Sequence, residues 1–561
     1  MAGRAVGQVL IVEYLKKEVL FYVAVCSLIL CIILFLVFRT ILGILIPLVS
    51  VLLGLGLFIG FMSLTGTPLD IMSTLFPPLM LIIGMSDVIH IMSKYIDEQH
   101  RGVERFLAMK KTIKEIGFAT LLTSLTTAIG FLALLSSRIE PIRLFGVWAA
   151  IGVSIAYLTV IGFTCMWLLF YDGRAIGNPR VNKLGWSALI QEIFKIVSKR
   201  PGIISVLGII VIIVSIFGIS RVSTNYTLLS DVPKDSKLRE DFKYFENVLA
   251  GARPLDIAII PAEGKTVFSP DVMRATEAYE EKLREFEEIK DVVSPVTFIK
   301  EINKAMNGGV MSGYKLPDND RRFEEYGKLF NRLKERSTVN LTNDSNTLGR
   351  LTAKIKDIGS DDMKNIYQQL QTWEDENIDP DLVDFKYTGK IYLVDKNTDY
   401  LVNGLFYGLG FALIIVGILM GLLFRDFKMV FISFVPNILP LLVTGGVMGI
   451  LGIELKSTTS IIFTIAFGVA VDDTIHFLSR YRQQKMINST ISMAIRNTFK
   501  ESGKAIMLTT LILVCGFAAL AFSKFTATFY VGVLISITMI TALLADLFIL
   551  PLLLYFFDRK S

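Results

Sequence analysis

Two short motifs each place an aspartate and a histidine within a long apolar run. The first reads Gly-Met-Ser-Asp87-Val-Ile-His90, and the second reads Gly-Val-Ala-Val-Asp472-Asp473-Thr-Ile-His476. Each histidine follows an aspartate by three residues, and His476 also follows Asp472 by four, so in a helix these side chains share one face. A carboxylate beside an imidazole forms a site that can take up and release protons near neutral pH. The five residues therefore predict a proton relay.

The structural alternative is a hydrogen-bonded cluster that packs helices and takes no part in transport. An ionisable group in hydrocarbon costs about 2.5–3.5 kcal/mol on insertion scales, so such groups persist mainly where they have a function. We therefore favour the relay for Asp87 and Asp473. For His90 and His476, contact with lipid headgroups is an equal alternative, because both lie near the ends of their apolar runs.

Hydroxyl side chains are frequent in two other apolar runs. They could line the cleft around the carboxylates, and the candidates are Thr123, Ser124, Thr127, Thr509 and Thr510. The equal alternative is that these hydroxyls bond to their own helix backbone or allow helices to pack closely.

The composition of the 561-residue chain is that of a membrane protein. Hydrophobic residues make up 53% of the chain, charged residues make up 19%, and the mean hydropathy is +0.57. A soluble protein of this size carries about 25% charged residues. Disordered chains, fibres, disulfide scaffolds and single-core cytosolic enzymes are excluded. We expect no enzyme, metal or cofactor, because the sequence shows no nucleophile–base set and no metal-ligand spacing.

The predicted fold is a polytopic α-helical membrane protein with about eleven spans. A span needs about 20 apolar residues. The qualifying segments lie near 19–38, 41–64, 70–95, 117–136, 142–171, 202–220, 401–424, 429–452, 457–481, 504–523 and 527–556. Lysine and arginine concentrate in the connections after Tyr95, Phe170 and Tyr481. The positive-inside rule then predicts a cytoplasmic C-terminus and an extracytoplasmic segment 221–398.

The chain contains an internal repeat at a constant offset of 386 residues, the separation of Asp87 and Asp473. His90 and His476 repeat at the same offset, and so do several glycines and tyrosines. Ionisable residues that repeat in one register indicate a duplication, here with both copies in the same orientation. Asp546 lies opposite Val160, so we interpret Asp546 as a local packing or interfacial residue outside the relay.

The repeat also predicts the division of the chain. Residues 1–18 lie opposite the end of the second soluble segment, so we expect them to be the end of a missing first soluble domain. A genuine eleven-helix protein is the alternative. The remaining parts are a first five-helix bundle (19–171), a cytoplasmic linker (172–201), one helix (202–220), an extracytoplasmic porter-like domain (221–398) and a second five-helix bundle (399–561).

The soluble segment is predicted to be an α+β module of the split βαβ kind. It contains no histidine, no cysteine and no catalytic motif. We expect strands at 255–260 and 291–296, helices at 270–288, 346–358 and 361–377, and extended chain at 382–394.

The motifs Gly84-Met-Ser-Asp87 and Gly468-Val-Ala-Val-Asp472-Asp473, with the duplicated plan, resemble the resistance–nodulation–division (RND) superfamily. The hydrophobe-exporting branch is most similar, with the MMPL-type lipid transporters, hopanoid transporters and Patched-like proteins. The resemblance implies that Asp87 and Asp473 relay protons and that 221–398 is a porter domain. The chain departs from this branch in having Val88 and Thr474, where tyrosine often follows the aspartate.

We therefore expect proton-driven export of lipids or other amphiphiles, in a multi-pass protein of the inner membrane. The expected partners are a lipid or hydrophobic small molecule, a homo-oligomer or a periplasmic protein, and no nucleic acid. The first alternative is a sterol- or lipid-sensing protein that binds without pumping. A protein-secretion accessory subunit ranks last, because its halves usually have six helices.

Overall fold

The computed structural model describes residues 4–558, apart from 68, 69, 71, 177–185, 226, 228, 230–236, 249, 250, 252, 335–339, 488 and 489. The middle of the predicted linker 172–201 thus lies outside the described residues. The chain forms two compact units, one of residues 1–223 and 400–561 and the other of residues 224–399.

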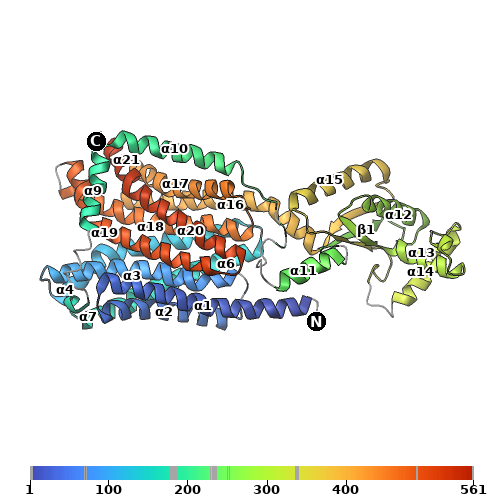
Figure 1. Ribbon diagram of the computed structural model, residues 1–561, viewed down its shortest axis with the longest axis horizontal. Helices are drawn as coiled ribbons and strands as arrows, with labels where there is room; N and C mark the ends of the chain where they lie inside the picture. Colours follow the sequence, from blue (N-terminus) through green and yellow to red (C-terminus); the bar gives the residue numbers. More distant parts are fainter. Residues whose placement is uncertain are drawn as a thin grey trace. The chain divides into compact units, whose positions relative to one another are not determined.

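The first unit is a helical bundle, and the described chain has eleven helices long and apolar enough to cross a membrane, which confirms the predicted number. Its main helices run along one another (Figure 1). In the first half they are α1 (Arg4–Phe38), α2 (Ile41–Leu64), α3 (Phe76–His100), α4 (Arg105–Thr112), α5 (Phe118–Leu132), α6 (Glu140–Thr159) and α7 (Cys165–Phe170). They are followed by α8 (Gly173–Ile176), α9 (Trp186–Lys199), α10 (Pro201–Ile219), α16 (Gly389–Phe424), α17 (Phe427–Leu451), α18 (Ser457–Ile487), α19 (Ile491–Ala518), α20 (Thr526–Leu544) and α21 (Leu550–Phe557).

Two helices lie at the centre of this bundle. The most apolar window of the span that contains α3 is wholly buried, and so is that of α18, whereas the corresponding window of α10 is 17% buried. Helix α18 packs against α5, α17, α19 and α20, and α3 packs against α2, α6 and α19. Both acidic motifs therefore lie on helices that neighbouring helices surround, which explains how charged groups are tolerated there.

The sequence repeat is visible in the backbone. Thr40 caps α2 by accepting a hydrogen bond from the Gly43 amide at 3.1 Å, and its equivalent Asp426 caps α17 through the Lys428 amide at 2.8 Å. Arg39 and Arg425, just before these caps, have positive φ angles of 53° and 50°. Short 3₁₀ turns at Ala133–Ser136 and Ala519–Phe522 repeat at the same offset.

The second unit has the split βαβ plan that the sequence predicts. Its strands β1 (Arg253–Pro261), β2 (Ile289–Val293), β3 (Gly349–Ile355) and β4 (Val383–Thr388) form one sheet in the order β2-β3-β1-β4, with antiparallel neighbours. Its helices are α11 (Lys237–Val248), α12 (Pro270–Arg284), α13 (Pro295–Met306), α14 (Asp320–Lys334) and α15 (Ser360–Asn377). Inward residues of β1 and β3, such as Ile257 and Leu351, form a core with residues of α12 and α15.

The predicted helix at 346–358 is wrong, because Gly349–Ile355 is strand β3. Leu351, Ala353 and Ile355 point inward in alternation, and pairing with β1 outweighs the helix propensity of alanine, lysine and arginine. The predicted extended segment 382–394 is correct only to Thr388, where β4 ends and α16 begins at Gly389. The second strand lies at 289–293, earlier than predicted, because Pro295 starts α13.

Candidate functional site

All five predicted relay residues lie in the interior of the bundle. Asp87 and His90 of α3 are 4% and 5% exposed, and Asp472, Asp473 and His476 of α18 are 8%, 6% and 7% exposed. The carboxylates therefore do not face acyl chains. For the histidines, the alternative of contact with lipid headgroups is wrong.

Each half supplies hydroxyl donors to its own aspartate. The Ser124 hydroxyl of α5 donates to Asp87 Oδ2 at 3.1 Å. In the second half, Thr509 and Thr510 of α19 donate to Asp473 Oδ1 and Oδ2 at 3.1 and 3.0 Å. Ser124 and Thr510 are repeat equivalents, so the two halves hold their aspartates in the same way.

The remaining predicted hydroxyls bond to backbone, and Thr123 also interacts with the Asp472 side chain of the other half. Thr127 donates to the Gly468 carbonyl of α18 at 2.8 Å, and Thr123 donates to the Thr120 carbonyl of its own helix at 3.0 Å. Helices α5 and α18 approach closely at this point, because a Cβ on Gly130 would lie 3.0 Å from the Gly468 Cα. Glycine at both positions allows the close contact that brings the two halves together at the motifs.

Asp472 joins the two halves. Its Oδ2 accepts a hydrogen bond from the Ser86 hydroxyl of α3 at 3.3 Å, and its Oδ1 lies 3.2 Å from His476 Nε2. Ser86 is the repeat equivalent of Asp472, so the second half carries an extra acid where the first half has a hydroxyl. That acid lies beside an imidazole and can balance its positive charge.

The two histidines form a stacked pair. The ring centroids of His90 and His476 are 4.1 Å apart, and the rings are inclined by 18°. Two imidazolium ions at this distance repel each other strongly in a buried site.

His90, Asp472 and His476 could also hold a metal ion. Each offers one ligand atom, and these atoms lie within 4.8 Å of one another. Imidazole nitrogen and carboxylate oxygen suit Zn²⁺ and similar ions. The prediction of no metal-ligand cluster missed this group because its members come from two helices that are distant in the sequence.

Asp546 is a buried acid that the sequence interpretation left out of the site. It is 1% exposed, and its Oδ1 accepts a hydrogen bond from the Thr474 hydroxyl at 2.7 Å. The interfacial interpretation is therefore wrong, whereas local packing fits. Asp546 also lies close enough to Asp473 to interact with it electrostatically, so it is a further buried acid beside the second motif. Its position in an apolar span was the signal that could have found it.

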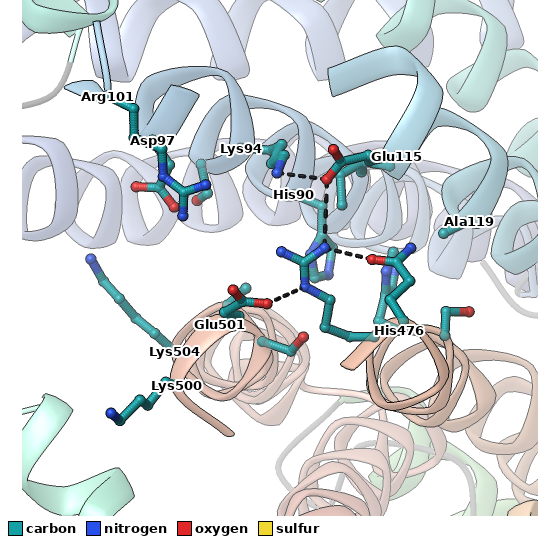
Figure 2. A pocket seen from close by; sticks show the side chains of 17 residues that line it. His90, Lys94, Asp97, Arg101, Glu115, Ala119, His476, Lys500, Glu501 and Lys504 are labelled. Carbon is teal, nitrogen blue, oxygen red and sulfur yellow. Dashed lines mark hydrogen bonds and ion pairs between the residues drawn. The ribbon is translucent and has the colours of Figure 1, made fainter. Parts of the chain in front are cut away.

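A polar cavity of about 250 Å³ adjoins the stacked histidines. Residues of both halves line it, and Figure 2 shows His90 and His476 beside charged side chains of the same cavity. Its charged lining residues are Lys94, Asp97, Arg101, Glu115, Arg480, Lys500, Glu501 and Lys504. Water in this cavity would have direct contact with the histidine pair.

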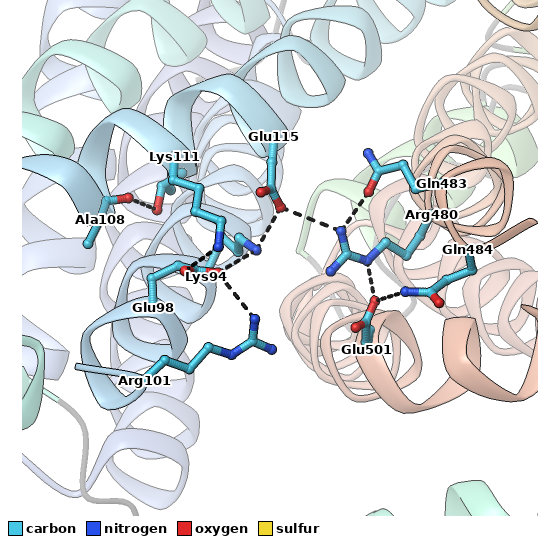
Figure 3. A network of polar contacts seen from close by, with 11 residues as sticks. Lys94, Glu98, Arg101, Ala108, Lys111, Glu115, Arg480, Gln483, Gln484 and Glu501 are labelled. Carbon is cyan, nitrogen blue, oxygen red and sulfur yellow. Dashed lines mark hydrogen bonds and ion pairs between the residues drawn. The ribbon is translucent and has the colours of Figure 1, made fainter. Parts of the chain in front are cut away.

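An ion-pair network crosses the bundle at this cavity (Figure 3). Lys94 Nζ lies 2.7 Å from Glu115 Oε2, and Arg480 Nε lies 2.5 Å from Glu501 Oε2. Arg480 Nη1 also lies 3.5 Å from Glu115 Oε2 and so links the second half to the first. No motif in the sequence predicted this network.

Residues 1–204 and 340–561 match the MMPL family. The chain belongs to the MMPL family. This membership confirms the predicted place in the MMPL-type branch of the RND superfamily. The family match includes both acidic motifs and both five-helix bundles.

Two similar proteins support the membrane fold. A membrane protein of Methanocaldococcus jannaschii is 23% identical over 389 residues, which cover 66% of this chain and 95% of that protein. SecDF from Thermus thermophilus, a translocon-associated membrane protein, has a TM-score of 0.58 and 13% identity over 97% of this chain. The chain spans 63% of the length of SecDF, and at this identity the likeness shows the fold alone.

Proposed function

We propose that this MMPL family protein is a secondary transporter that couples proton movement to export of a lipid or other amphiphile. The observation that carries the proposal is the symmetric pair of buried acids. Asp87 and Asp473 occupy equivalent positions on the two central helices, and each accepts hydrogen bonds from hydroxyls of its own half. A change in protonation of either acid changes the hydrogen bonds that hold its central helix to a neighbouring helix of the same half, and such a change can favour one conformation over another, as a coupled transporter requires.

In this proposal, protons reach the two aspartates through the histidines. Along α3 and α18, the stacked pair His90–His476 lies between the two aspartates and the rest of the cavity lining, and Asp472 lies 3.2 Å from His476. Imidazole can accept a proton on one nitrogen and release it from the other. We infer that this group passes protons between water in the cavity and the carboxylates.

An apolar groove supports an amphiphile as the substrate. The groove has a volume of about 700 Å³, and α10 forms one wall with Ile203, Leu207 and Val211. Phe548 and Ile549 lie on the other wall, close in sequence to Asp546. Charged residues of α9 and its end also line the groove, and the set Glu192, Lys195, Lys199 and Arg200 is net basic although Lys195 pairs with Glu192 at 2.5 Å. An apolar groove with a net basic set of charged residues fits an acyl chain with an anionic headgroup.

Two other functions compete with this proposal. The fold of SecDF favours a role as an accessory subunit, and lipid sensing without pumping is compatible with the groove. Both differ from the proposal in one respect: only a coupled pump requires Asp87 and Asp473 to exchange protons during lipid movement.

The test uses the purified full chain in liposomes with an imposed pH gradient. A fluorescent phosphatidylglycerol is the lipid probe, and an entrapped pH dye reports proton flux. We expect Asp87→Asn and Asp473→Asn each to reduce both fluxes by about 10²-fold, because each removes a group that must ionise. Asp362→Asn, at an exposed position of α15, is the matched control and should leave both unchanged. Unchanged fluxes in the two buried variants would overturn the proposal.

A further inference from the structure

We propose that Glu115 and Arg480 form a latch between the two halves, which limits the access of bulk water and protons to the polar cavity and to the His90–His476 pair that lines it. The role of the latch in transport rests on the proposed function. The latch itself rests on contacts and on the repeat.

The latch is built from repeat equivalents. At the offset of 386 residues, Lys94 corresponds to Arg480 and Glu115 corresponds to Glu501. Each half makes the same internal ion pair, at 2.7 Å from Lys94 to Glu115 and at 2.5 Å from Arg480 to Glu501. A symmetric molecule would therefore have two independent pairs, one in each half.

The sequence breaks this symmetry at two positions. Arginine in place of lysine gives Arg480 a second nitrogen that reaches Glu115 across the halves, at 3.5 Å. In the first half, the second partner of Lys94 is Glu98 of the same half, at 2.9 Å. The equivalent of Glu98 is Gln484, a neutral residue that donates to Glu501 at 2.8 Å. The contact between the halves is thus made by the arginine of the second half and not by the lysine of the first.

The latch lies on the same cavity as the histidine pair. Glu115 and Arg480 line the cavity together with His90 and His476. Ser93 and Ser479, which are also repeat equivalents, line it as well, each three residues past its histidine. Movement of the latch therefore changes the surroundings of the histidines directly (Figure 2).

The distances favour the latch as the contact that opens first. At 3.5 Å it is longer than the two internal pairs, and its side chains are partly exposed, 22% for Arg480 and 25% for Glu115. When it opens, Glu115 keeps Lys94 and Arg480 keeps Glu501, so no charge is left without a partner. Opening therefore avoids the cost of an uncompensated buried charge.

The first experiment measures access to the cavity. Ser479→Cys is introduced into the full chain after Cys26, Cys31, Cys165 and Cys515 are replaced by alanine. The labelling rate with a charged, water-soluble thiol reagent is then measured. We expect Arg480→Gln to raise this rate about fivefold, the effect of removing a partly exposed ion pair. The matched control is Lys94→Gln, the equivalent change in the first half, which leaves the latch in place and should not raise the rate.

The second experiment closes the latch covalently. A short bismaleimide links Glu115→Cys to Arg480→Cys across the halves, or Lys94→Cys to Glu115→Cys within the first half. We expect the first link to abolish proton uptake in liposomes and the second to preserve it. Transport that continues with the first link in place would overturn the inference.

The two experiments separate this inference from the proposed function. Equal labelling in the parent, Arg480→Gln and Lys94→Gln proteins would overturn the latch, whatever the transport result. If the parent protein moves no protons, the proposed function fails, and the labelling comparison still decides whether the latch exists. Labelling of Ser345→Cys, exposed in the second unit, confirms that the reagent reacts equally in all the variants at a site away from the cavity.

Discussion

His90 and His476 occupy the same position in the two repeats and stack directly on each other, with ring centroids 4.1 Å apart. Ser86 and Asp472, another equivalent pair, are joined by a hydrogen bond of 3.3 Å. Equivalent residues touch each other only near the axis that relates the two copies. The repeat axis therefore passes between these pairs, and any change in the relation of the halves changes the contacts of the relay.

We expect transport to be unaffected by a chelator such as EDTA, because the proposal assigns His90, Asp472 and His476 to proton transfer. The measurement is proton uptake by liposomes after dialysis against the chelator, with zinc added back to one sample. Loss of uptake that zinc restores would identify a metal centre at these three residues and would contradict the relay.

We expect Thr474→Val to destabilise the protein by about 1–3 kcal/mol, because it leaves the buried Asp546 carboxylate without its 2.7 Å donor. Thr541→Val on α20 is the matched control, since the Thr541 hydroxyl donates to the carbonyl of Ile537 of its own helix, at 2.8 Å. Thermal unfolding of the detergent-purified variants checks this. A control that is as unstable as Thr474→Val would show that Asp546 does not depend on this hydroxyl.

The sequence was sufficient to predict the features that depend on hydrophobicity and on charged residues within apolar segments. Long apolar segments predict the spans. Asp87 and Asp473 are identified as candidates because a charged group in hydrocarbon is costly and usually has a function. The ion pair between Glu115 and Arg480 could not be predicted, because Glu115 lies in a connection rich in charged residues and Arg480 lies at the end of a predicted span, where many pairings are equally compatible with the sequence. It needed the spatial arrangement of four helices.

The soluble unit shows a different limit. Its plan followed from the alternation of strands and helices, but β3 was predicted as a helix because Arg350, Ala353 and Lys354 favour helices in isolation. Pairing of Ala353 with Leu255 of β1 decides the conformation there. Local propensity failed where a contact distant in sequence was stronger.

We expect the stability of the second unit to fall as the pH rises through about 7, because burial raises the pKa of Glu374 from 4.5 to about 7. A raised pKa means that folding favours the neutral acid, so this stabilisation is complete below pH 4.5 and is lost as the pH passes 7. Glu374→Gln should remove this pH dependence and stabilise the unit above pH 7 by about 1–3 kcal/mol.

Hydrogen exchange of β4 in the full chain, at pH 5 and pH 8, measures this effect, because the Phe385 amide donates to Glu374 Oε1 at 3.3 Å. Exchange, corrected for its intrinsic pH dependence, should be faster at pH 8 in the parent and unchanged in Glu374→Gln. The exposed variant Glu376→Gln, on the same helix, should behave as the parent does. The same pH dependence in all three proteins would contradict the prediction.

We expect Gly130→Ala to destabilise the bundle by about 1–3 kcal/mol and to slow transport, because the added Cβ would lie 3.0 Å from the Gly468 Cα. The clash pushes α5 away from α18 and lengthens the hydrogen bond from Thr127 to the Gly468 carbonyl, which is now 2.8 Å. Gly410→Ala on α16 meets nothing within 4 Å and should be neutral or slightly stabilising, because alanine favours helix. Thermal unfolding and proton uptake distinguish the two variants. Equal behaviour would mean that the halves are not held together at this contact.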